Sequence, residues 1–391
     1  MPLIVLACLL LSLASWGVLA AGAYLLWSWY EGVWALDAYG ATHHVRETWQ
    51  LWTALALLSW SFLGRLVLTP ILAKADDEPT RAERCEHQMI TSPTGSNLYV
   101  EVHGPEDAPP IILTHGWGLD STIWYYLRRH LSQRFRVIVW DLPGLGRSRA
   151  ASGSTVDLSH FATDLKALLS LTNGKPAVLV GHSIGGMTLQ TLVRDYPEVL
   201  TDQVAGLVLV NTTYVNPLQT MVLSRLALAI RWPLLEPVFH LAIWLQPLAW
   251  LGAWQSYLSG SAHLANRIGF ASQVTRSQLE QTTLLATRNP PAVLARGNLA
   301  MFRWDAESAI GQAAVPCLIL AGDKDLVTKQ EASEHIASQA PFARLRVIDD
   351  ANHMGFLERS DAYNEEISRF CELNLMTRAS DGVRQPTPTL A

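Results

Sequence analysis

Charged side chains are scarce in this chain of 391 residues. They make up 16% of it, whereas soluble domains carry roughly 25%, and 49% of the residues are hydrophobic. Apolar surface must therefore be placed somewhere other than water, and a membrane segment is the expected place. Lysine and arginine form no long run, and the formal net charge is only −5. A nucleic-acid groove is therefore not expected, and we predict no nucleic-acid partner.

The chain also lacks Cys-x-x-Cys pairs and any other cysteine spacing that is typical of a metal site. Its four cysteines are scattered as Cys8, Cys85, Cys317 and Cys371. Such scatter is typical of packing thiols in a reducing compartment. His43 and His44 are adjacent, but without a nearby set of further ligands we interpret them as loop residues and predict no metal site.

The first long apolar stretch covers residues 3–30, which contain no charge. Its length is sufficient to cross the roughly 30 Å hydrocarbon core of a bilayer as a helix. A cleaved signal peptide is the alternative, with a possible cleavage site at residues 19–21. That alternative needs a basic segment at the start, which residues 1–4 do not provide. We therefore expect an uncleaved transmembrane helix.

A second apolar stretch covers residues 49–73 and is interrupted by Arg65 and Pro70. An arginine in the middle of a bilayer costs about 2.5 to 3.5 kcal/mol on insertion scales. The simplest arrangement is a span over about residues 46–64, with Arg65 snorkelling at the interface and residues 66–73 lying on the membrane surface. The alternative is an amphipathic helix packed on the soluble part of the chain.

Basic residues are distributed unevenly around the second stretch. The connection at residues 31–47 holds Arg46 as its only lysine or arginine, whereas four lie late in the stretch or beyond it: Arg65, Lys74, Arg81 and Arg84. By the positive-inside rule, two spanning helices would place the chain beyond them on the cytoplasmic side. If only the first stretch spans, that chain lies on the same side as the connection.

A polar linker at residues 74–79 precedes a region in which short β-rich runs alternate with helical segments. This alternation predicts a mostly parallel sheet with crossover helices, with strands at residues 99–103, 111–114, 137–140, 177–180, 205–210, 317–321 and 345–348. We divide the chain into an anchor and linker (1–78), an α/β domain (79–376) with a helical insertion at about 214–306, and a disordered tail (377–391).

The sequence GHSIGG at residues 181–186 follows one of these strands and precedes a helical segment. This is a G-x-S-x-G motif in the setting that it requires, because the sharp turn exposes the serine and leaves no room for side chains at the glycines. We predict Ser183 as a nucleophile. The bare pattern arises by chance in some chains, so the strand before it and the helix after it carry the prediction.

A serine nucleophile needs a base, and the base needs an acid that fixes its tautomer. Asp325 and His353 each follow a predicted strand, at the sheet edge where open parallel sheets place their sites. The order Ser183, Asp325, His353 is the one expected with a nucleophile elbow. Asp323 is a local alternative for the acid.

An oxyanion intermediate needs backbone N–H donors. One is expected from Ile184, directly after the nucleophile. The second is expected from the loop HGWG at residues 115–118, where the glycines allow close approach and Trp117 is the predicted donor. A plain glycine turn is the alternative interpretation of this loop.

From about residue 89 to residue 371 the chain resembles the α/β-hydrolase superfamily. The matching segments are HGWG, DLPGLGRS at residues 141–148, GHSIGG, GDKD at residues 322–325 and the His353 loop. The resemblance implies an eight-stranded, mostly parallel sheet, a lid after the sixth strand, and no metal or organic cofactor. It favours Asp325 over Asp323 as the acid, and Asn211 excludes the variant that keeps its acid at the end of the sixth strand. The N-terminal apolar stretches lie outside the resemblance.

The expected reaction is hydrolysis of a carboxylic ester through an acyl-enzyme on Ser183. Residues 218–258 contain only three charges, so the insertion either lines a lipophilic acyl pocket, dips into the bilayer or packs on itself. The expected partners are therefore a lipophilic ester, such as a monoacylglycerol or lysophospholipid, and a lipid bilayer. Two alternatives remain: a C–C bond hydrolase or perhydrolase with the same triad, and a ligand-binding protein without turnover.

Overall fold

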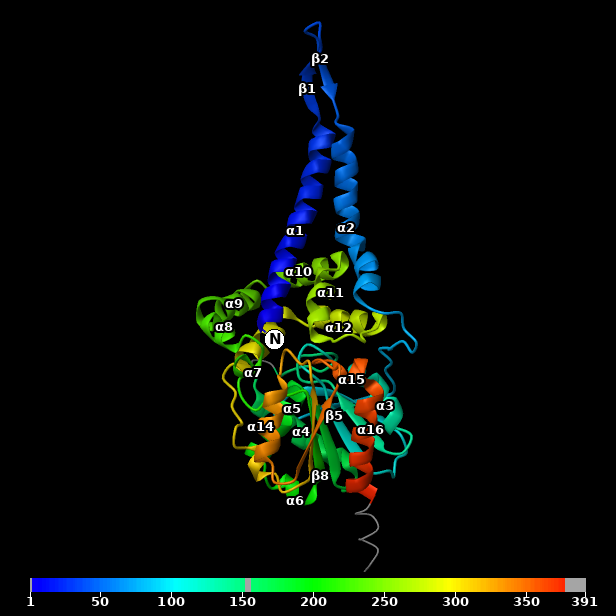
Figure 1. Ribbon diagram of the computed structural model, residues 1–391, viewed down its shortest axis with the longest axis vertical. Coiled ribbons are helices and arrows are strands. Elements are labelled where there is room, and N and C mark those ends of the chain that lie inside the picture. Colours follow the sequence, from blue (N-terminus) through cyan, green and yellow to red (C-terminus); the bar gives the residue numbers. More distant parts are fainter. Residues whose placement is uncertain (1, 152–155, 377–391) are drawn as a thin grey trace, which may run out of the picture.

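The central feature of the computed structural model, which describes residues 2–151 and 156–376, is an eight-stranded sheet (Figure 1). Its order is β10-β9-β8-β7-β5-β6-β4-β3. The strands β5 to β10 run parallel where they pair, while β4 pairs antiparallel with both β6 and β3. The bounds are β3 His87–Thr91, β4 Asn97–His103, β5 Pro110–Thr114, β6 Arg136–Trp140, β7 Ala177–His182, β8 Val204–Val210, β9 Cys317–Gly322 and β10 Ala343–Ile348.

All seven strands predicted from the sequence are present. The strands β5, β7, β8 and β9 are buried along their whole length, as continuous apolar runs in a parallel sheet should be. The eighth strand, β3, was not predicted because it is a short edge strand with the polar and largely exposed sequence HQMIT. The predicted disordered tail at residues 377–391 lies outside the described residues.

Helices cover both faces of the sheet (Figure 1). Side chains that alternate along the strands form two apolar clusters, one on each face. On one face pack α4 (Leu158–Leu168), α5 (Ile184–Asp195) and α14 (Gln330–Gln339), and on the other α3 (Tyr125–Leu131) and α16 (Ser360–Cys371). Shorter helical segments are η1 Ser121–Trp124, η2 Leu169–Thr172, α6 Val199–Asp202, η5 Ile310–Gln312, α15 Gly355–Glu358 and η6 Glu372–Met376.

Residues 214–306, here termed the lid, connect β8 to β9 as a series of helices. Their bounds are α7 Pro217–Thr220, α8 Ser224–Ala229, η3 Arg231–Leu235, α9 Glu236–Trp244, α10 Gln246–Ser259, α11 Ser261–Asn266, η4 Arg267–Gly269, α12 Arg276–Arg288 and α13 Pro291–Met301. Part of the lid packs on itself around Leu235, Phe239 and Phe302. The lid lies over the end of the sheet at which β7, β8 and β9 terminate (Figure 1).

The N-terminal helices α1 (Pro2–Glu31) and α2 (Thr48–Leu72) form a hairpin that extends away from the sheet beyond the lid (Figure 1). The segments Leu9–Glu31 and Thr48–Leu72 are long and apolar enough to cross a membrane. A two-stranded ribbon that the sequence did not predict, β1 (Val33–Leu36) with β2 (Thr42–Val45), joins the two helices at the far end.

Arg65 is placed differently from the expectation. Its guanidinium has partners that the sequence did not predict: it donates to Glu280 of α12 at 2.7 Å and to the hydroxyl of Tyr257 at 3.2 Å. The helix continues without a break through Pro70 to Leu72, so residues 66–73 are not a separate surface segment. The pairing with Glu280 partly neutralises this charge where the hairpin meets the lid.

Candidate active site

Ser183 occupies a strained turn between β7 and α5. Its φ of 54° lies in the left-handed region, which non-glycine residues rarely adopt. A Cβ added to Gly181 would collide with the backbone of Gly185, and one added to Gly185 would collide with the carbonyl of Thr114. The two glycines of the motif are therefore required by close backbone approach, and the turn that they permit holds the serine above the end of the sheet.

The three residues predicted as a triad converge in space although they come from three separate loops. The Oγ of Ser183 lies 3.1 Å from Nε2 of His353, and Nδ1 of His353 lies 3.0 Å from Oδ2 of Asp325. All three are nearly buried, with exposed fractions of 7%, 2% and 5% for Ser183, His353 and Asp325. This geometry lets the imidazole accept the serine proton while the carboxylate orients it.

The carboxylate of Asp325 is held by five donors. Oδ1 accepts from the backbone N–H groups of Val327 and Thr328, and Oδ2 accepts from the Thr328 hydroxyl and from Asn211 Nδ2 as well as from His353. Burial alone would raise the pKa of Asp325, but the charge and hydrogen bond of His353 together with the other donors lower it to about 2. Asp325 is therefore ionised at every pH near neutrality.

Asp323, the alternative acid, is directed elsewhere. Its Oδ1 accepts from the backbone N–H of Ala351 at 3.0 Å, and the neighbouring Lys324 N–H donates to the carbonyl of Ala351. This carboxylate thus joins the loop after β9 to the loop that carries His353. The geometry favours Asp325 as the partner of the histidine.

The loop of His353 is fixed by contacts on both sides. Glu358 accepts from the backbone N–H of Asn352 at 2.9 Å, and Nε2 of His182 lies 3.0 Å from the carbonyl oxygen of His353. Complete burial and the adjacent His353 lower the pKa of His182 well below its usual value. A neutral His182 can donate its Nε2 proton to that carbonyl without bringing a second positive charge to the site.

The two predicted oxyanion donors lie at the start of α5 and in the loop after β5. Ile184 is the first residue of α5, where helix N–H groups have no partner within the helix. Within the described residues the backbone N–H of Trp117 donates to no hydrogen bond, whereas its indole Nε1 donates to the carbonyl of Leu294 in the lid. His115 stiffens this loop, because its Nε2 accepts from the Leu142 N–H at 2.9 Å.

Comparisons with known proteins show the family to which the chain belongs. Residues 109–360 match the model of a family described as the alpha/beta hydrolase fold. This chain belongs to the α/β-hydrolase family. A pimeloyl-acyl-carrier-protein methyl ester esterase of Yersinia pseudotuberculosis is 24% identical over 272 residues, which are 68% of this chain and 93% of that protein.

Two further proteins extend the comparison. A bifunctional esterase/perhydrolase of Acinetobacter calcoaceticus is 36% identical over 123 residues, which are 31% of this chain and 43% of that protein. The crystal structure of an esterase from Rhodococcus sp. ECU1013 superposes with a TM-score of 0.59 at 20% identity and covers 74% of this chain and 100% of that one. That structure shows the common fold, and the relatives are hydrolases of the esterase type.

Three residues near the triad of this α/β hydrolase were not predicted as site residues. Thr328 donates to Asp325 and lies 3.3 Å from Nδ1 of His353, while Asn211 donates to Asp325 and accepts from the Tyr363 hydroxyl. Sequence reasoning used Asn211 only to exclude an acid at that position. The available signal was its place at the end of β8, next to the strand that carries Ser183.

The contact of Asn211 predicts that Asn211→Asp lowers kcat by about tenfold to a hundredfold. Two carboxylates within 3 Å cannot both ionise, so one of them takes a proton and the orienting charge on Asp325 is weakened. Steady-state kinetics from pH 5 to 9 on an ester that the native enzyme hydrolyses would measure the effect. An unchanged kcat throughout this range would show that Asn211 does not position the acid.

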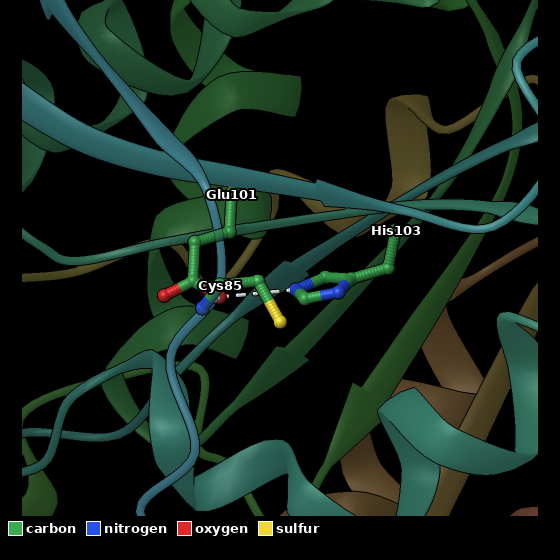
Figure 2. Close-up of side chains that lie close together, drawn as sticks. All are labelled: Cys85, Glu101 and His103. Atoms are coloured by element: carbon green, nitrogen blue, oxygen red, sulfur yellow. Dashed lines mark hydrogen bonds and ion pairs between the residues drawn. The ribbon is translucent and has the colours of Figure 1, made fainter.

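Cys85, Glu101 and His103 bring three potential metal-ligand atoms within 4.8 Å of one another (Figure 2). The Glu101 carboxylate, however, already accepts from the Cys85 N–H and the Tyr99 hydroxyl, and His103 Nε2 lies 3.1 Å from it. The guanidinium groups of Arg84 and Arg128 also lie 3.7 Å from Glu101. The two guanidinium groups beside the carboxylate would repel a bound metal cation. We therefore assign this cluster to the packing of β4.

Proposed function

We propose that this α/β hydrolase is a membrane-anchored serine esterase that cleaves lipophilic carboxylic esters. The observation that carries the proposal is the continuous hydrogen-bonded series from Ser183 through His353 to Asp325. In this proposal residues 1–78 form the anchor and linker, and residues 79–376 form the hydrolase domain with its lid. The esterase-type relatives support the ester bond as the target.

The first half of the reaction forms an acyl-enzyme. Ser183 Oγ attacks the ester carbonyl carbon while His353 Nε2 takes the hydroxyl proton, and the negative oxygen is stabilised by the N–H groups of Trp117 and Ile184. The tetrahedral intermediate then collapses and expels the alcohol, which receives the proton from His353. Asp325 remains ionised and stabilises the imidazolium throughout.

The second half regenerates the enzyme. A water molecule attacks the acyl carbon and gives a proton to His353. This attack forms a second tetrahedral intermediate, with its oxyanion in the same position. Collapse of this intermediate breaks the bond to Ser183 Oγ, returns the proton to it and releases the carboxylic acid. No group outside these residues and water is needed for the proton balance.

The position of the lid supports a lipophilic substrate. Helix α13 lies against the loop of the proposed oxyanion hole through the bond from the Trp117 indole to Leu294, and Met354 N–H, next to His353, donates to Gly269 in the lid. The same lid contacts α2 through Arg65 and Glu280. The catalytic face is thus turned towards the apolar hairpin (Figure 1).

The esterase proposal is tested with a series of p-nitrophenyl esters from acetate to palmitate, assayed with the full-length protein in detergent micelles. We expect hydrolysis of all soluble members and a higher kcat/KM for medium and long acyl chains. Absence of turnover on every ester, with correctly folded protein, would contradict the proposal.

A perhydrolase activity on the same triad is a second candidate, because the esterase/perhydrolase relative is 36% identical over its matching segment. In that reaction hydrogen peroxide replaces water as the second nucleophile and the product is a peracid. Adding peroxide to the ester assay and measuring peracid by bromide oxidation separates the two activities.

If both apolar helices span the membrane, the ribbon tip and the hydrolase domain lie on opposite faces. A cysteine at Tyr39, which is 95% exposed in the ribbon, is then accessible only from the face opposite to a cysteine at Glu365 on α16. By the positive-inside rule Glu365 is on the cytoplasmic side. Labelling of intact cells with an impermeant maleimide measures this directly, and equal labelling of both positions would contradict the two-span topology.

A further inference from the structure

The outer surface of the lid is apolar although it is exposed. Trp244 is 79% exposed at the end of α9, and Leu248 and Leu251 are 62% and 54% exposed on α10; further exposed members are Leu223, Leu226, Trp232 and Leu241. Within residues 218–258 the charges are Arg225, Arg231 and Glu236, and the last two pair with each other at 2.8 Å. In a soluble monomer an exposed apolar patch of this kind would promote aggregation unless something covered it.

The far end of the apolar hairpin is marked by charges and aromatic rings. Glu31 ends α1, and Arg46 lies just before α2 with its guanidinium 5.3 Å from the ring of Trp29 and 5.6 Å from that of Tyr30. Tryptophan and tyrosine beside a cation are typical of the membrane–water interface. We therefore take this level as the distal boundary of the hydrocarbon core.

The lid meets the hairpin at a defined level on each helix. Ser15 Oγ donates to Ser259 Oγ at 2.6 Å, and Gln255 Nε2 donates to the Ser15 carbonyl. On the other helix Gly64 is so close to the carbonyl of Ser259 that a Cβ would collide with it. Small and polar side chains of this kind are the usual means of close helix packing in lipid.

In both α1 and α2, the part of the helix between the distal boundary and the lid is too short to span a bilayer by itself. At 1.5 Å per residue, the rise from Ser15 to Glu31 is about 24 Å, and so is the rise from Thr48 to Gly64. The hydrocarbon core is about 30 Å thick, and any tilt shortens the helices further along its normal. The core must therefore extend several ångströms beyond the level at which the lid is attached.

We propose that the lid is embedded in the membrane leaflet next to the hydrolase domain, with the exposed face of α9 and α10 in contact with lipid acyl chains. This inference rests on the proposed function, because the hairpin must span the bilayer. The substrate is then an amphiphilic ester resident in that leaflet. The substrate reaches Ser183 through the lid rather than from water, since the lid lies between the leaflet and the His353 loop. Asn352 in that loop holds the lid, because its Nδ2 donates to the carbonyls of Ile268 and Phe270.

The position of the lid is tested with spin labels on the full-length protein in phosphatidylcholine vesicles. Cys8 and Cys85 are replaced by serine, the buried Cys317 and Cys371 are kept, and a label is placed at Leu251→Cys or, as the aqueous control, Glu365→Cys. We expect the Leu251 label to be relaxed by oxygen and protected from a water-soluble nickel chelate, with the opposite result at Glu365. Equal accessibility to the nickel chelate at both positions would overturn the embedding.

Delivery from the leaflet is tested by kinetics on two substrates. The triple variant Trp244→Glu, Leu248→Glu, Leu251→Glu should lose about tenfold or more of its rate on monooleoylglycerol in phosphatidylcholine vesicles, because carboxylates resist insertion. Its rate on soluble p-nitrophenyl acetate should stay within about twofold. Phe342→Glu, at an exposed position between α14 and β10, is the matched control and should change neither rate.

The outcomes separate the two proposals. Equal rates of the triple variant and native protein on vesicles would overturn delivery through the lid. If the native protein hydrolyses neither ester, the proposed function fails, whereas the spin-label result still decides whether the lid is embedded.

Discussion

Asp325→Asn is expected to lower kcat by about 10⁴-fold. In the native enzyme Oδ1 accepts from the backbone N–H groups of Val327 and Thr328, which would keep an asparagine carbonyl in the same place. The new amide would then point its N–H₂ towards His353 Nδ1 and force the proton onto Nε2, which is the atom that must accept from Ser183. The same amide would face Asn211 Nδ2, so two donors would oppose each other.

Asp323→Asn is the matched control. An asparagine at this position can still accept from the Ala351 N–H through its carbonyl oxygen, so kcat should stay within about threefold of the native value. Steady-state kinetics on one soluble ester, with circular dichroism to verify folding, compare the two variants. A larger loss for Asp323→Asn than for Asp325→Asn would assign the acid to Asp323.

Ser183→Ala is expected to produce the largest loss, about 10⁶-fold in kcat, because the triad acts as a unit and no neighbouring group can form the acyl-enzyme. The variant should fold normally, since among the described residues the serine hydroxyl hydrogen-bonds to His353 alone and the turn is set by the glycines around it. Its thermal unfolding midpoint should be unchanged or slightly higher, because active-site groups are kept for function rather than for stability.

The control for this variant is Ser338→Ala on α14, where the hydroxyl donates to the carbonyl of His335 in its own helix. That substitution should leave kcat unchanged. Residual activity of Ser183→Ala above about one percent of the native rate, after contamination is excluded by repeated purification, would mean that another nucleophile carries the reaction.

The buried strands and the triad were predictable because their signals are local. Continuous apolar runs mark the strands that are covered on both faces, and the carboxyl ends of such strands meet at one edge. That rule brings Ser183, Asp325 and His353 to the same edge of the sheet, and the resemblance to the family favours Asp325 over Asp323 as the acid. The exposed edge strand His87–Thr91 has no such signal, and neither has the ribbon between α1 and α2.

The contacts that cross large sequence separations were not predictable. Arg65 was expected to point to the membrane interface because nothing in the sequence shows that Glu280 lies opposite to it. Asn211 is a similar case, since its donation to Asp325 depends on the register between β8 and β9. Such partners follow from the tertiary fold rather than from any pattern around the residue itself.

Mapping the site of fluorophosphonate modification in the native full-length protein tests whether Ser183 is the nucleophile of an ester hydrolase. We expect one adduct per chain, located by mass spectrometry on the peptide that contains Ser183, with esterase activity lost in proportion to labelling. Ser183→Ala should take up no label. Labelling of that variant at the native rate, or full esterase activity in protein whose Ser183 is modified, would show that Ser183 is not the nucleophile.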